Sequence, residues 1–275
     1  MTPFPDLIER DGLRLRPLSP ADGDAVCRHL SDPETARWLA AVTRPFGPAE
    51  YAALLDHGQQ DDTHLRGLEV GGVLAGCLCI GPALWYWLAS EHRGRGLMRR
   101  ALTAALAARF SGPAPPVTAT CHVDNIPSQK LLTALGFALS PRPRRMFFHG
   151  DGAPASCQDY LMAPEQWHLL HPPRISLGPL TLRPALQKDA PLLARMQSGR
   201  WPEAGALPAF IEEHRYRGGP SGLFAIHDAD RRCIGMALVA AGRTDLRFLD
   251  ATEEARHRST LDTALSQGLT AVLSP

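Results

Sequence analysis

The chain has 275 residues, a formal net charge of +1 and an apolar fraction of 44%. This length accommodates one large domain or two small ones, and the apolar fraction is ordinary for a globular protein with a sizeable core. A net charge this small excludes a bulk electrostatic case for nucleic acid or an anionic membrane as partner.

Neither a membrane segment nor a targeting segment is indicated. No apolar run is long enough to span a bilayer, and the first residues lack the basic and apolar regions of a signal peptide. The six cysteines include no Cys-x-x-Cys pair, which favours buried free thiols over disulfides or a metal site. We therefore expect a cytoplasmic protein without a bound metal.

The first 80 residues predict a strand, helices and a hairpin. Their signals are alternation of apolar and polar residues in the strands, and caps and proline-marked starts in the helices. The expected elements are a strand at 13–17, a helix from Asp22 to about Leu30, a helix at 48–59, and strands at 65–70 and 73–80 around the turn Gly71-Gly72.

A strand, a glycine-arginine loop and a helix follow. Residues 84–89 form a bulky apolar run typical of a buried strand, and residues 98–110 predict a helix. Gly94 and Gly96, placed between them, allow a tight turn with no Cβ in the way. The N–H groups at a helix start lack intrahelical partners, so a phosphate or pyrophosphate is their natural occupant. From these residues alone, a plain strand-to-helix turn remains an equal alternative.

The arginines around this loop add a second signal. Guanidinium groups suit phosphate oxygens, although they fit a solvated helix face equally well. The arginines concerned are Arg93, Arg95, Arg99 and Arg100.

A second strand and helix complete the pattern. Residues 117–123 alternate, with Val117, Ala119 and Cys121 on one face. Asn125 then predicts a helix cap and Gly136 the helix end. A hairpin is expected at 144–149 and 156–162, and the whole order predicts an α/β fold with a mixed sheet.

The pairing of Arg93-Gly94-Arg95-Gly96 with Asn125-x-x-Ser128 and the closing Leu135-Gly136-Phe137 resembles the two signature segments of the GNAT N-acetyltransferase superfamily. The similarity is greatest to the branch of the ribosomal-protein N-terminal (alanine/serine) acetyltransferases. The resemblance covers about residues 8–168, and the domain is expected at 1–170. It implies an α/β (α+β) GNAT fold, with a mixed, mostly antiparallel central sheet that is splayed between two strands and flanked by helices.

The resemblance also implies acetyl-CoA as co-substrate, with its pantetheine inserted where the strands part. Backbone groups at Trp87 and Leu88 would pair with the pantetheine, and N–H groups of residues 93–98 would hold the pyrophosphate. The implied cofactor-binding set is Trp87, Leu88, Arg93, Gly94, Arg95, Gly96, Leu97, Met98, Asn125, Ser128 and Lys130.

The implied reaction is direct attack of an amine on the thioester. A backbone N–H near Leu88 would stabilise the oxyanion. Ser128 is the expected acid for the departing thiolate, although a helix-start hydrogen bond is an alternative role for it. The general base stays open: His122 titrates in the right range but also fits a structural histidine. Other candidates are Glu34, Glu69, Tyr86 and a chain of water molecules.

Acceptor and assembly are less constrained. The acceptor would be a primary amine of a peptide N-terminus or a small molecule, and the alternative function is a non-catalytic acyl-CoA sensor or interaction module. The arginines at 142, 144 and 145 fit either a solvated hairpin edge or contact with an acidic acceptor. A homodimer is a further expectation.

The remaining chain echoes the beginning. Residues 180–184 repeat residues 13–17, and Asp189 stands where Asp22 does. We therefore expect a degenerate, truncated second copy at 171–275, with chance similarity as the alternative. The alignment places residues 256–258, Arg-His-Arg, opposite residues 94–96. Side chains there would crowd the backbone, so the copy is expected to have lost cofactor binding.

Overall fold

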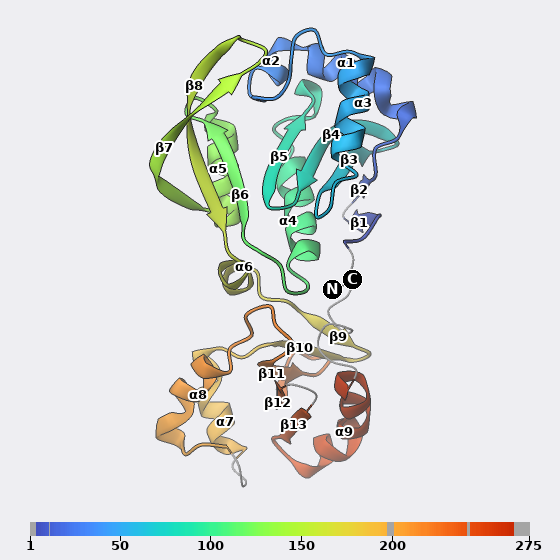
Figure 1. Cartoon of the computed structure of the whole chain (residues 1–275). Helices are drawn as coiled ribbons and strands as arrows, with labels where there is room; N and C mark the ends of the chain where they lie inside the picture. Colours follow the sequence, from blue (N-terminus) through green and yellow to red (C-terminus); the bar gives the residue numbers. More distant parts are fainter. Residues whose placement is uncertain (1–3, 11, 197–200, 241–242, 267–275) are drawn as a thin grey trace. The chain divides into compact units, whose positions relative to one another are not determined.

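The computed structural model describes residues 4–10, 12–196, 201–240 and 243–266. They divide into two compact units (Figure 1). The N-terminal unit contains the described residues of 3–109 and 114–163. The C-terminal unit contains those from 164 onward together with 110–113. Within the described residues, no helix has the length and apolarity needed to cross a membrane.

The N-terminal unit is built on an eight-stranded sheet in the order β1-β2-β3-β4-β5-β6-β8-β7. Its neighbouring strands are antiparallel except for the parallel pair β5–β6. This confirms the expected mixed, mostly antiparallel sheet. The strands are β1 (Ile8–Arg10), β2 (Leu13–Arg16), β3 (His64–Val70), β4 (Val73–Ile80), β5 (Ala83–Leu88), β6 (Val117–His122), β7 (Ala138–Phe148) and β8 (Ala153–Met162).

Helices cover both faces of this sheet (Figure 1). Apolar side chains of α1 and α3, among them Leu30 and Tyr51, pack with Cys77 and Trp87 on one face. Helices α4 and α5 lie on the other face. The helices are α1 (Gly23–Ser31), α2 (Pro33–Ala36), α3 (Pro48–His57), α4 (Leu97–Arg109) and α5 (Ile126–Leu135).

Strand β7 begins six residues before the predicted strand start at 144. The two prolines at 141 and 143 argued against a strand in the sequence. They are tolerated because β7 is the edge strand of the sheet and its register with β8 shifts between Leu139 and Pro143. The short helix α2 was also not predicted.

The sheet opens between β5 and β6. Only two residue pairs join them, Ala83 with Thr118 and Leu84 with Ala119. Residues 85–88 of β5 have no partner in β6 among the described residues, and the two strands diverge (Figure 1). The expected splay is therefore confirmed, and it lies directly before the glycine loop.

The C-terminal unit has a five-stranded antiparallel sheet in the order β13-β12-β11-β10-β9. Helix α9 packs on one face, and α7 and α8 pack on the other. The strands are β9 (Ile175–Leu177), β10 (Leu180–Pro184), β11 (Gly222–His227), β12 (Cys233–Ala240) and β13 (Arg243–Phe248). The helices are α6 (Pro164–Leu170), α7 (Ala190–Arg195), α8 (Leu207–Glu213) and α9 (Ala251–Ser266).

In each unit an arginine at the end of an early strand forms an ion pair with an aspartate six residues later. After β2, the Arg16 guanidinium donates to both carboxylate oxygens of Asp22 over 2.9 and 2.8 Å. After β10, Arg183 donates to both oxygens of Asp189 over 2.7 and 2.8 Å. Burial alone would raise the pKa of each aspartate. The paired arginine helps to keep that pKa below its ordinary value in both units. These bidentate pairs fix the turn from strand to helix.

Candidate active site

Backbone polar groups line β5 on the side from which β6 departs. The N–H of Ala89 donates to the carbonyl of Ala75 in β4 over 2.9 Å. Hydrogen-bonded pairs alternate along an antiparallel ladder, so Trp87 is also bonded to β4. The backbone groups of Tyr86 and Leu88 therefore face the opening. The expected backbone role of Trp87 is corrected, because this alternation turns its N–H and carbonyl away.

The glycine loop between β5 and α4 is open. Gly94 and Gly96 have φ angles of 76° and 69°, in the left-handed region that favours glycine. A Cβ on either glycine would meet no heavy atom within 4 Å. The N–H of Arg100 donates to the carbonyl of Gly96 over 3.1 Å, which begins the helix. Among the hydrogen bonds of the described residues, none uses the N–H groups of residues 94–98.

The electrostatics of this helix start favour an anion. The first turn of α4 contains no acidic residue, and the side chains of Arg95 and Arg99 are exposed. Leu97 and Met98 bury their side chains, so the first turn is anchored on the sheet. Unpaired N–H groups, the helix dipole and nearby guanidinium groups together make an anion-binding cradle.

Arg93 has a different position from the one expected. Its N–H donates to Ser90 over 3.2 Å, so it is not available to a phosphate. Its guanidinium donates to the Leu88 carbonyl over 3.0 Å and to the Thr35 hydroxyl over 2.8 Å. Arg93 therefore ties the loop to β5 and to α2. Arg93 thus leaves the set of N–H groups that were expected to hold a pyrophosphate, and the N–H groups from Gly94 onward remain in it.

The start of α5 brings a second set of expected residues to the site. The Asn125 side chain accepts from the N–H of Ser128 over 3.2 Å and so caps the helix. Lys130 is exposed and follows Ser128 by two residues, about 200° around the helix, so its side chain leaves from another face. Asn125 and Ser128 are thus joined locally, while Lys130 points away from them.

A hydrogen bond connects the two sides of the opening. The Tyr86 hydroxyl of β5 lies 2.7 Å from the Ser128 hydroxyl of α5. Burial raises the pKa of Tyr86 far above its ordinary value, and the hydrogen bond to Ser128 offsets this only in part. Tyr86 is therefore a protonated phenol and does not fit the role of general base. Sequence reasoning named both residues but gave no signal that they meet.

His122 lies in an aromatic environment. Its ring packs edge-on against Trp38 and Phe148, with centroids 5.6 and 5.4 Å away. Its Nδ1 accepts from the N–H of Asp124 over 3.0 Å, which puts the proton of the neutral ring on Nε2. In this tautomer the only lone pair is already engaged, so the arrangement matches a structural histidine.

The two glutamates considered as bases are paired with arginines. Glu69 accepts from Arg16 over 2.8 Å and lies 3.8 Å from Arg14. The side chain of Glu34 is 69% exposed and pairs with Arg37 over 3.5 Å. In the part of the chain that the structure describes, no contact directs either carboxylate toward the opening between β5 and β6.

The C-terminal unit has no matching loop among its described residues. Residues 256–258, aligned with the glycine loop in the sequence, lie inside α9, so that alignment is wrong. Only residues 249 and 250 separate β13 from α9. The Asp250 carboxylate accepts from the N–H groups of Thr252 and Glu253, each over 2.9 Å. The sequence Asp250-x-x-Glu253 was a helix-start signal that would have given this position.

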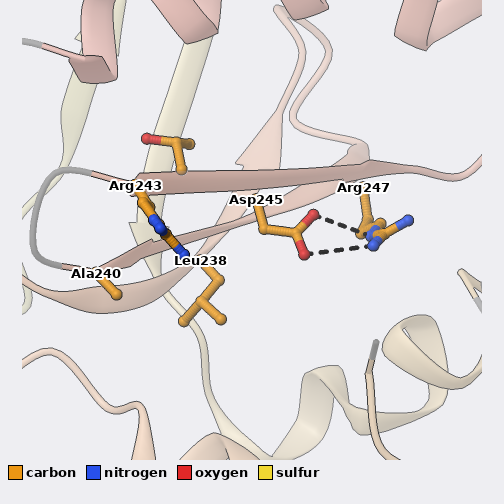
Figure 2. Close-up of a pocket in the computed structure, with 6 residues that line it drawn as sticks. Leu238, Ala240, Arg243, Asp245 and Arg247 are labelled. Carbon is orange, nitrogen blue, oxygen red and sulfur yellow. Dashed lines mark hydrogen bonds and ion pairs between the residues drawn. The ribbon is translucent and has the colours of Figure 1, made fainter. Parts of the chain in front are cut away.

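A hollow on the C-terminal unit is lined by side chains of β12 and β13, as Figure 2 shows. Its carboxylate is already engaged. Asp245 accepts from Arg247 over 3.3 Å and from the Trp201 ring over 3.2 Å. The hollow therefore brings no free nucleophile or base together among the described residues.

Residues 12–138 match the family model described as an acetyltransferase (GNAT) domain. A solved structure described as a candidate acetyltransferase from T. thermophilus is 27% identical, with a TM-score of 0.51 over 61% of this chain and 94% of the other. A second candidate acetyltransferase is 26% identical, with the same TM-score and coverage. The ribosomal-protein-S5-alanine acetyltransferase from Vibrio fischeri is 18% identical, with a TM-score of 0.49 over 58% of this chain and 98% of the other. No curated protein matches the chain.

Proposed function

We propose that the N-terminal unit, whose residues 12–138 match the acetyltransferase (GNAT) domain family, transfers an acetyl group from acetyl-CoA to a primary amine. One observation carries the proposal: an open loop of two left-handed glycines lies at a helix start, directly after a strand whose neighbour has parted from it. The first feature suits a pyrophosphate and the second suits an extended pantetheine chain.

The residues present fit acetyl-CoA at this place. N–H groups from Gly94 to Met98 would hold the pyrophosphate, with Arg95 and Arg99 beside it. Backbone groups of Tyr86 would pair with the pantetheine as a missing strand would, and the N–H of Leu88 faces the same opening, while the Leu88 carbonyl accepts from Arg93. A Cβ on either glycine would meet no heavy atom of the described protein within 4 Å, so a pyrophosphate could approach the backbone there.

Bound acetyl-CoA supplies an activated acyl group. The protein's part is to hold the thioester beside the amine, which is worth up to about 7–11 kcal/mol of the barrier for well-oriented partners. The N–H of Leu88 faces the opening and would donate to the developing oxyanion. The Ser128 hydroxyl would donate to the departing sulfur. Since His122, Glu34 and Glu69 are engaged elsewhere, we assign loss of the amine proton to solvent water.

The acceptor is proposed as a peptide N-terminus or a small-molecule amine. The signature segments resemble those of the ribosomal-protein branch, so peptides beginning with alanine or serine are the first acceptors to test. We further propose that the C-terminal unit is a truncated copy that does not bind CoA, since Asp250 occupies its helix start. Its five strands have the order of β1 to β5 in the N-terminal unit, and it has the same arginine-aspartate pair.

The test is calorimetric binding of acetyl-CoA to the full chain and to Gly94→Val/Gly96→Val. We expect the wild type to bind and the double variant to lose at least about 100-fold in affinity, roughly 2.7 kcal/mol. The matched control is Gly71→Val/Gly72→Val, whose glycines also have positive φ and open space but lie in the β3–β4 turn. This control carries the same backbone strain and should bind normally.

Turnover separates the enzyme from a non-catalytic sensor. Release of CoA thiol with peptides beginning with alanine or serine, or with a small amine, is expected from wild type. Binding without release across the panel would favour the sensor or interaction module. Absence of binding would overturn the proposal altogether.

A further inference from the structure

The contact between Tyr86 and Ser128 crosses the opening of the sheet. Tyr86 projects from β5, and Ser128 belongs to the helix that follows β6. Their hydroxyl oxygens are 2.7 Å apart, which is ideal for an O–H···O hydrogen bond. The pantetheine chain is proposed to run between β5 and β6, the two strands that part at the opening. The hydrogen bond therefore lies beside the path of the reactive sulfur and is not part of the distant core.

The direction of this hydrogen bond follows from the surroundings. A serine hydroxyl has one proton and two lone pairs, so it can accept from one neighbour and donate to another. Burial keeps the Tyr86 phenol protonated, and the neighbouring Cys121 and Tyr160 side chains shift its pKa in the same direction. Burial also raises the pKa of the Cys121 thiol beside Ser128, so that neighbour is neutral. With the phenol as donor, the serine proton is left for an acceptor other than Tyr86, and the Cys121 sulfur is the neighbour that a CoA sulfur would have to replace.

We infer that Tyr86 is a positioning residue for acetyl transfer: its hydroxyl donates to Ser128 and directs the serine proton toward the sulfur of CoA. The inference rests on the proposed function. A chain of two hydroxyl groups is a stronger donor than one alone, because each hydrogen bond polarises the next. It also fixes the rotation of the serine hydroxyl, which would otherwise be free to point elsewhere.

The proton balance is complete. As the amine nitrogen bonds to the acyl carbon, the carbon–sulfur bond breaks and its electron pair stays on sulfur. The sulfur leaves as a thiolate that accepts a hydrogen bond from Ser128, while Tyr86 keeps its proton and donates a hydrogen bond to Ser128. The amine gives one proton to solvent, and the thiolate takes one from solvent. No oxidant or further reactant is needed.

The experiment follows the thiol of bound CoA, so it needs no knowledge of the acceptor. Ultraviolet absorbance of the thiolate is titrated against pH for CoA bound to wild type, Tyr86→Phe, Ser128→Ala and the double variant. We expect the thiol to titrate lower on wild type than in free CoA. In Tyr86→Phe it should titrate about one unit higher than on wild type, which is about tenfold less thiolate at a fixed pH. The double variant should match Ser128→Ala, because Tyr86 acts through Ser128.

Two controls keep the result interpretable. Tyr160→Phe removes another hydroxyl of the same sheet and should leave the titration unchanged. Ser128→Thr is the conservative variant: it keeps a hydroxyl, so its bound thiol should titrate below that of Ser128→Ala. If Tyr86→Phe binds CoA normally and its thiol titrates as on wild type, the inference is overturned while the proposed function stands. If wild type binds no CoA, the proposed function itself fails.

Discussion

The two units contain the same strand junction with opposite endings. In β4 and β5, Gly76 lies opposite Leu88; in β12 and β13, Gly235 lies opposite Phe248. A Cβ on either glycine would come within 2.5 Å of a carbonyl in the neighbouring strand, so both junctions need glycine. The residue after each strand then donates back to the preceding strand over 2.9 Å. Up to this point the backbones follow one plan.

They differ in what comes next. Eight residues, 89–96, separate β5 from α4, whereas two residues, 249 and 250, separate β13 from α9. The longer connection leaves the N–H groups at the start of α4 open; the shorter one has Asp250 as a carboxylate cap. Acidic residues follow in the first turn of α9, and none in that of α4. The difference teaches that a shared scaffold carries an anion site only where the loop leaves the helix start unpaired.

The largest expected effects concern the feature that the units share. Asp189→Ala leaves the partly buried Arg183 without its carboxylate, which should cost about 3–5 kcal/mol of unfolding free energy; Asp22→Ala should cost less, because Arg16 keeps its hydrogen bond to Glu69. Hydrogen exchange read separately on β2 and β10 measures this. Each variant should increase exchange mainly in its own unit. Equal loss of protection in both units would show that the two arrangements do not act independently.

The next prediction makes the start of α4 resemble the start of α9. Gly96→Asp places a carboxylate at the start of α4, as Asp250 does at α9. We expect acetyl-CoA affinity to fall by at least about 100-fold, roughly 2.7 kcal/mol, in calorimetry. Gly96→Asn is the matched control, since asparagine also tolerates positive φ but carries no charge. A smaller loss in Gly96→Asn than in Gly96→Asp is expected; equal losses would contradict an electrostatic origin.

The reverse change is milder. Asp250→Ala removes the cap of α9 and should destabilise the C-terminal unit by about 1 kcal/mol in chemical denaturation. It should create no CoA binding, because the connection remains short. Measurable CoA binding by this variant in a chain that also carries Gly94→Val/Gly96→Val would sink the argument that loop length is required.

The smallest effect concerns pH. Burial lowers the pKa of His168 in α6 from its ordinary 6.5, with its ring centroid 5.0 Å from that of Tyr216. The unfolded chain therefore binds the proton more readily, so stability falls as pH drops below 6.5 and levels off below the folded pKa. His168→Leu should flatten this part of the profile of unfolding free energy against pH. An unchanged slope would show that other histidines account for it.

Much of the fold could be predicted because its signals are local. Gly94, Gly96 and the helix cap Asn125 indicate their backbone conformation by residue type alone. The alternation of buried residues from Val117 follows from the periodicity of a strand. The opening between β5 and β6 came only from the family resemblance, since nothing in either strand encodes divergence from a distant neighbour.

The rest of the site depends on contacts far apart in the sequence. Arg93 was expected near phosphate because it flanks the loop, but its guanidinium reaches Thr35, 58 residues earlier. Tyr86 meets Ser128 across 42 residues. The alignment of residues 256–258 failed because similar composition outweighed the capping signal at Asp250. Side-chain partners of this kind need the folded backbone before they can be identified.

The guanidinium of Arg93 has one further consequence. It joins the end of β5, the glycine loop and α2 through the Leu88 carbonyl, the Glu34 carbonyl and the Thr35 hydroxyl. A ligand that immobilises the loop thereby lowers the entropic cost of ordering α2, and a ligand on α2 returns the same benefit to the loop. Two substrates that touch these separate segments would reinforce each other's binding by equal factors, whichever arrives first.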